Sequence, residues 1–220
     1  MMTLCTHMGR GKTTAIAAAL LISLSVAAFA GDRSDKRYGK IEKMRPFEQI
    51  EYLRGLESDG ERGAELYYHM GNAFYSLEQP DSSITYLRMA TRIDTTYSRA
   101  WVNLGIAYDT SRRRRDARDA YNHAIAVNPN DVLAYCHLGF NYFEGGDVDR
   151  AVKLYGRALE IDPDSAQARY NLGLAFADAK LFHEALIEWN RVVELDPDGQ
   201  LGKIAAENVG LIQTYLELDN

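Results

Sequence analysis

The stretch of sequence that decides the fold covers residues 132–165 and reads VLAYCHLGFNYFEGGDVDRAVKLYGRALEIDPDS. Its pattern of large, small and proline residues returns at a fixed interval along the chain. Glycines mark an interval of 34 residues, at Gly71, Gly105, Gly139 and Gly173. Prolines keep the same interval, at Pro129, Pro163 and Pro197. The chain is therefore predicted to be a repeat protein.

Each repeat carries two clusters of fixed residues. In the stretch quoted above, Leu138 and Tyr142 belong to the first cluster, while Ala151, Tyr155 and Ala158 form the second. The members of a cluster are three or four residues apart, which places them on one face of an amphipathic helix. Each repeat is therefore predicted to be a pair of helices.

The glycines and prolines have separate roles in these pairs. A glycine inside a helix costs roughly 1 kcal/mol relative to alanine, so its regular return indicates close approach of a second helix or a large ring. Proline cannot continue a helix, and each proline of the series is expected to follow the end of a second helix. Aspartate and serine beside the prolines, such as Asp131 and Ser165, are expected to cap the next helix.

This residue pattern closely resembles that of the tetratricopeptide repeat family. The resemblance implies an all-α fold, a right-handed α-solenoid of helix-turn-helix repeats with capping helices at both ends. Four repeats are expected at residues 64–97, 98–131, 132–165 and 166–199. Residues 46–63 are predicted to form an N-terminal half-repeat, and residues 200–220 a C-terminal capping helix.

The N-terminal residues have a different character. Arg10 and Lys12 precede an uncharged run that closes with Ala28-Phe29-Ala30, which is the pattern of a secretory signal peptide over residues 1–30. Export is expected, to the periplasm, with cleavage after Ala30. An uncleaved membrane anchor is the alternative. The charged segment 31–45 is predicted to be a mobile linker.

Charge and cysteine content narrow the classes of function. The chain of 220 residues has 25 basic and 31 acidic side chains; without Arg10 and Lys12, the 23 remaining basic groups leave a net charge of −8. An acidic protein is a poor binder of nucleic acid or anionic membranes, so no nucleic acid is expected and membrane contact only through an uncleaved N-terminus. Cys136 alone remains after cleavage, which excludes an intramolecular disulfide and favours a buried thiol.

No catalytic or metal-binding pattern stands out. The histidines His69, His123, His137 and His183 lack partners at the spacing of a shared helix face. Cys136 and His137 are neighbours in sequence and point about 100° apart on a helix. We therefore expect no enzyme activity, no cofactor and no metal, although an unrecognised site around Cys136 stays open.

The family resemblance implies that the first helices of the repeats line a concave groove for a peptide or a helix of a partner protein. We call the residues expected to face this groove the inner strip: Tyr68, Asn72, Tyr75, Val102, Ile106, Asp109, Cys136, Phe140, Phe143, Tyr170 and Leu174. The alternative is that these side chains pack between the repeats. An aromatic strip that the repeat core does not need favours recognition of an apolar segment.

Two other binding modes were considered. Some grooves of this family clamp the C-terminal carboxylate of chaperones; Asn72 and Asn103 match that motif, but Tyr68 and Leu133 occupy its lysine positions, so this mode is not expected. Four consecutive arginines, which we call the arginine turn, lie between the two clusters of the second repeat: Arg112, Arg113, Arg114 and Arg115. A solvated turn is the plain interpretation, and contact with an acidic partner or an anion is the alternative.

The sequence thus predicts a non-enzymatic adaptor or scaffold that binds a partner protein. The second hypothesis is a self-associating structural component of an envelope assembly, such as a pilus, secretion or outer-membrane machine. In that hypothesis the chain forms homo-oligomers.

Overall fold

The computed structural model describes residues 38–218, and the predicted signal peptide therefore lies outside the described residues. Within this range the chain forms ten α-helices, one short 3-10 helix and no strand. The all-α prediction is confirmed. The elements are η1 (Ile41–Lys43), α2 (Pro46–Ser58), α3 (Ala64–Ser76), α4 (Pro80–Ile93), α5 (Ser98–Thr110), α6 (Arg114–Val127), α7 (Val132–Glu144), α8 (Val148–Ile161), α9 (Ala166–Asp178), α10 (Phe182–Leu195) and α11 (Gln200–Leu218).

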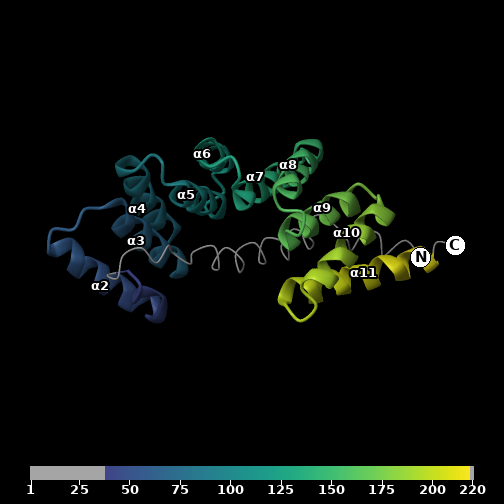
Figure 1. The fold of residues 1–220 in the computed structure, drawn as a ribbon, viewed down its shortest axis with the longest axis horizontal. Coiled ribbons are helices and arrows are strands. Elements are labelled where there is room, and N and C mark those ends of the chain that lie inside the picture. Colours follow the sequence, from purple (N-terminus) through teal and green to yellow (C-terminus); the bar gives the residue numbers. More distant parts are fainter. Residues whose placement is uncertain (1–37, 219–220) are drawn as a thin grey trace. The chain divides into compact units, whose positions relative to one another are not determined.

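The helices keep the period of 34 residues (Figure 1). The even-numbered helices α2 to α10 begin at residues 46, 80, 114, 148 and 182. The odd-numbered helices α3 to α11 begin at residues 64, 98, 132, 166 and 200. Helices α2 and α11 are therefore in phase with the repeats, α2 as a second helix and α11 as a first helix.

The described chain divides into two compact units. Unit 1 ends at Asp94 and contains η1 and α2 to α4, in which α3 contacts both α2 and α4. Ile50 of α2 packs with Ala73 and Phe74 of α3. The described part of the segment 31–45 belongs to this unit, where Tyr38 is buried and its ring stacks on His69.

Unit 2 begins at Thr95 and contains α5 to α11. Each first helix contacts the second helix of its own repeat, as α5 does with α6, and each second helix contacts the first helix of the next repeat. First helices also contact one another, α5 with α7, α7 with α9, and α9 with α11. The first helices of this unit thus form one continuous row, in which α7 has a neighbour on each side.

Glycine explains how closely the two helices of a repeat approach. The bulky residue at the centre of each second helix lies against the glycine of the first: Leu87 on Gly71, Tyr121 on Gly105, Tyr155 on Gly139 and Trp189 on Gly173. A Cβ atom at Gly139 would lie 2.6 Å from Cε1 of Tyr155, far inside normal contact. The close approach predicted from sequence is confirmed in all four repeats.

The connections between repeats follow the proline pattern. Helices α6, α8 and α10 each end two residues before a proline of the series. Asp131 then caps α7 by accepting from the amide of Ala134 at 3.1 Å, and Ser165 caps α9 by accepting from Ala168 at 3.3 Å. These two caps confirm the predicted role of aspartate and serine.

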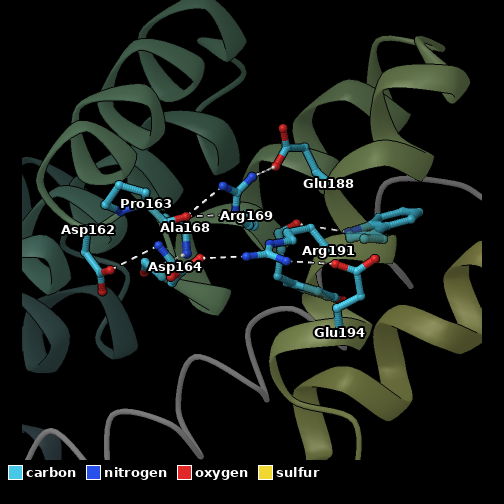
Figure 2. Close-up of polar contacts among 11 residues, drawn as sticks. Asp162, Pro163, Asp164, Ala168, Arg169, Glu188, Arg191 and Glu194 are labelled. Carbon is cyan, nitrogen blue, oxygen red and sulfur yellow. Dashed lines mark hydrogen bonds and ion pairs between the residues drawn. The ribbon is translucent and has the colours of Figure 1, made fainter.

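Arginines fasten the connection between α8 and α9 (Figure 2). Arg169 donates to the carbonyl oxygen of Pro163 at 2.7 and 3.0 Å, and its third nitrogen donates to Glu188 of α10 at 2.8 Å. Arg191 of α10 reaches Asp164 of the same connection at 3.0 Å. The start of the fourth repeat is thereby tied to both of its helices.

None of the helices in residues 38–218 combines the length and the apolar character needed to cross a membrane.

Candidate protein-binding surface

The inner strip begins in unit 1 on helix α3. Tyr68, Asn72 and Tyr75 all lie on this helix, and all three are buried. The ring of Tyr68 meets the imidazole of His69 edge-on, with 5.3 Å between the ring centroids. Sequence reasoning assigned no role to His69, although it follows a strip residue directly and receives the Tyr38 ring.

Cys136 is the strip residue with the clearest structural role. Its thiol is fully buried and packs with Ala158 of α8 and Ala168 of α9. Burial, with the charges of Asp131 and Asp162, raises the pKa of the thiol to about 12. The thiol therefore stays protonated at neutral pH, and a thiolate nucleophile at Cys136 has no support from its surroundings.

The aromatic part of the strip lies on α7 and α9. Phe140 and Phe143 are in contact, with ring centroids 6.3 Å apart, and Phe140 is half-buried. Tyr170 packs against Trp189, and its hydroxyl accepts from Asn208 of α11 at 3.4 Å. Phe140 and Phe143 are thus brought together, while Tyr170 also serves the packing between α9, α10 and α11.

The remaining strip residues of unit 2 are apolar apart from Asp109. Val102 and Ile106 of α5 and Leu174 of α9 are buried. Asp109, near the end of α5, accepts from the Tyr121 hydroxyl at 3.0 Å and from the Asn141 side-chain amide at 2.5 Å. The carboxylate therefore joins all three helices α5, α6 and α7.

Sequence reasoning missed two residues of this polar cluster, Arg118 and Asn141. Arg118 Nε donates to Asn141 Oδ1 at 2.6 Å, and Asn141 is only 1% exposed. The signal was available in the repeat register, since Arg118 stands where other repeats have Val152 or Leu186. A polar residue at a position that is otherwise apolar indicates a buried polar contact.

The arginine turn begins at the connection of α5 and α6 and continues into the first turn of α6. All four arginines are exposed. Arg113 bonds to Asp116 at 2.7 Å and lies over the Tyr108 ring, while Arg114 bonds to Glu144 of α7 at 3.2 Å. Two of the four cations thus have intramolecular partners, and contact with an acidic partner stays a prediction.

No group of three or more His, Cys, Asp or Glu side chains in residues 38–218 is arranged to hold a metal ion.

Two family models match the chain. The model described as tetratricopeptide repeat matches residues 64–97 and 98–131, and the model described as TPR repeat matches residues 141–179. The chain belongs to the tetratricopeptide repeat family. The first two matches coincide with the repeats predicted from the glycine spacing.

Solved structures place this tetratricopeptide repeat protein beside MamA. One crystal structure of MamA is 26% identical, has a TM-score of 0.65, and covers 74% of this chain and 96% of its own. MamA from Desulfovibrio magneticus RS-1, solved from residue 41 to the end, is 18% identical with a TM-score of 0.64, covers 81% of this chain and 94% of its own, and shows the fold alone. The fold is a tetratricopeptide solenoid, as predicted.

A curated relative is more distant. The tetratricopeptide repeat domain-containing protein PYG7, chloroplastic, of Arabidopsis thaliana is 27% identical over 82 residues, which are 37% of this chain. The tetratricopeptide repeat protein spans about a quarter of that relative, 27% of its length. Together these similarities identify a protein-interaction or scaffold module.

Proposed function

We propose that this protein is a non-enzymatic scaffold, and that its inner strip binds an apolar segment or an amphipathic helix of a partner protein. The observation that carries the proposal is the contact between Phe140 and Phe143 on α7, the helix with a first helix on each side. Rigid aromatic side chains at such a central place are typical binding hot spots.

Affinity capture followed by substitution tests the proposal. A partner captured from an envelope fraction would be identified by mass spectrometry, purified and titrated by calorimetry. Phe140→Ala and Phe143→Ala should each weaken its binding by about 1 to 3 kcal/mol, with helicity and melting nearly unchanged. Ile187→Ala is the matched control, because Ile187 lies on the second helix α10 and is 66% exposed.

The outcomes separate the hypotheses. Unchanged affinity in a folded Phe140 and Phe143 double variant would rule out the inner strip as the site. If charge reversal at Arg113 and Arg114 alone reduced binding, the site would move to the arginine turn. Recovery of only the chain itself would favour the self-associating envelope component.

We also propose that the protein acts after export to the periplasm. The support is the signal-peptide pattern of residues 1–30. N-terminal sequencing of the protein from an envelope fraction tests this, and Gly31 as the first residue is the expected result. An intact Met1 in a membrane-extracted protein would indicate the anchored alternative.

A further inference from the structure

Three residues that depart from the repeat pattern meet in unit 2. Where the second repeat has Asp109, the first and third have Tyr75 and Phe143. Where it has Arg118, they have Ile84 and Val152. Asn141 of the third repeat takes a position that is alanine in the other three repeats: Ala73, Ala107 and Ala175. The departures thus come from three helices and two repeats.

These residues form one hydrogen-bonded chain across the junction of the second and third repeats. Arg118 of α6 donates to Asn141 Oδ1 at 2.6 Å, and Asn141 Nδ2 donates to Asp109 Oδ1 at 2.5 Å. Tyr121 of α6 donates to the other carboxylate oxygen, Oδ2, at 3.0 Å. At the junction of the third and fourth repeats the equivalent positions hold Phe143, Val152 and Ala175, none of which can form such a chain.

The Asp109 carboxylate lies among neutral donors. Both hydrogen bonds that it accepts come from uncharged groups, a hydroxyl and an amide. The nearby cations are engaged elsewhere, since Arg118 also lies over the Tyr142 ring at 4.3 Å and Arg114 pairs with Glu144 at 3.2 Å. A mostly buried carboxylate without a direct cationic partner favours its protonated form.

The charged and titratable groups around Asp109 come from all three helices. Helix α6 contributes Tyr121 and the two cations Arg114 and Arg118, while α7 contributes Glu144 and His137, whose ring stacks on Tyr121. Burial raises the pKa of Asp109 to about 6, although the bonds from Tyr121 and Asn141 and the charges of the two arginines lower it. Burial lowers the pKa of His137 to about 4, so this imidazole is neutral above that pH.

We propose that the junction between the second and third repeats is a proton-sensitive joint, in which Asp109 takes up a proton on mild acidification and holds the two repeats together more firmly. The device is independent of what the inner strip binds. It is confined to one junction, because the equivalent positions of the next junction have no carboxylate.

The sign of the effect follows from linkage. A carboxyl that binds its proton more tightly in the folded protein stabilises the fold as the pH decreases. For a pKa that rises from 3.8 to about 6, the unfolding constant should be about tenfold lower at pH 5 than at pH 7. His137 works in the opposite direction, so the Asp109 contribution must be isolated by substitution.

Hydrogen exchange of the full chain, compared between variants at the same pH, tests the joint. Asp109→Asn keeps the shape but cannot titrate, and Asp119→Asn, an exposed aspartate of the same repeat, is the matched control. Amides of α5 to α7 should be about tenfold better protected at pH 5 than at pH 7 in the wild type and in the control, relative to Asp109→Asn. Peptides from α9 and α10 should show no such difference.

A second variant and a second measurement keep the test decisive if Asp109→Asn folds poorly. The triple variant Asp109→Phe, Arg118→Val and Asn141→Ala copies the residues of the next junction and should lose the same pH dependence. Carbon-13 NMR of the wild type should show the Asp109 carboxyl titrating near pH 6. A carboxyl midpoint below pH 4.5, or the same protection profile in wild type and variants, would overturn the proposal.

Discussion

At the scale of single residues, Gly139 marks the closest contact within its repeat. Its ideal Cβ position lies 2.6 Å from Tyr155 Cε1 and 2.9 Å from Cδ1, on a ring that is itself buried. Gly139→Ala should therefore lower the free energy of unfolding by about 1 to 3 kcal/mol, and Gly139→Leu by more. Urea denaturation followed by circular dichroism measures the difference.

Gly156 provides the matched control for Gly139. It lies within α8, next to Tyr155, and a Cβ added there would meet nothing within 4 Å. Gly156→Ala should raise the stability by about 0.5 to 1 kcal/mol, since alanine favours the helix. If both alanine variants were stabilised, the steric explanation of the repeating glycines would fail.

His137 gives the protein a second response to acid. Burial lowers its pKa to about 4, whereas in the unfolded chain it titrates near 6.5, so stability present above pH 6.5 is lost as the pH falls toward 4. Between pH 7 and pH 5 this loss is about 2 kcal/mol. His137→Asn, which copies Asn103 and Asn171 of the neighbouring repeats, should remove it.

Chemical denaturation at pH 7 and pH 5 checks the histidine prediction. His183→Asn serves as the control, because His183 is exposed. An unchanged difference between the two pH values in His137→Asn would assign the acid response to other groups.

At the scale of elements, the tight turn inside each repeat has a residue of positive φ at one fixed position. Glu78, Arg112 and Lys180 adopt φ of 57°, 59° and 61°, and Gly146 adopts 83° in the third repeat. Such a conformation is costly for a residue with a Cβ. Lys180→Gly should therefore stabilise the protein by about 1 kcal/mol, and Gly146→Ala should destabilise it by a similar amount.

Thermal unfolding of these two variants tests the turn geometry. Lys180 is exposed, so its replacement removes no buried contact. A lower melting temperature for Lys180→Gly would contradict the expected left-handed backbone.

These elements show what the sequence could predict and what it could not. The ends of α6, α8 and α10 follow from proline, and two helix starts from Asp131 and Ser165, because these signals act locally. The positive φ at the turn was invisible, since three of its four residues are not glycine. The burial of Tyr38 on His69 was also unexpected, because contact between segments far apart in sequence leaves no local pattern.

At the scale of the whole molecule, the fold was more predictable than the site. A period of 34 residues fixes where each helix begins, because every repeat must meet its neighbours in the same way. The polar cluster was only half visible: Asp109 was assigned to the inner strip, but its partners Arg118 and Asn141 were not recognised. Their meaning appears only when repeats are compared position by position, since each residue is ordinary in isolation.

The common phase of α2 to α11 has a consequence for shortening the chain. Removing any 34 consecutive residues from within the array would rejoin the helices without a frame slip, because every starting point is separated by that same length. The contents would not always match. If residues 132–165 were deleted, Ala175 would arrive where Asn141 had been, and the carboxylate of Asp109 and the guanidinium of Arg118 would lose the amide that joins them. The repeats are therefore interchangeable in length, while the second repeat is made for one particular neighbour.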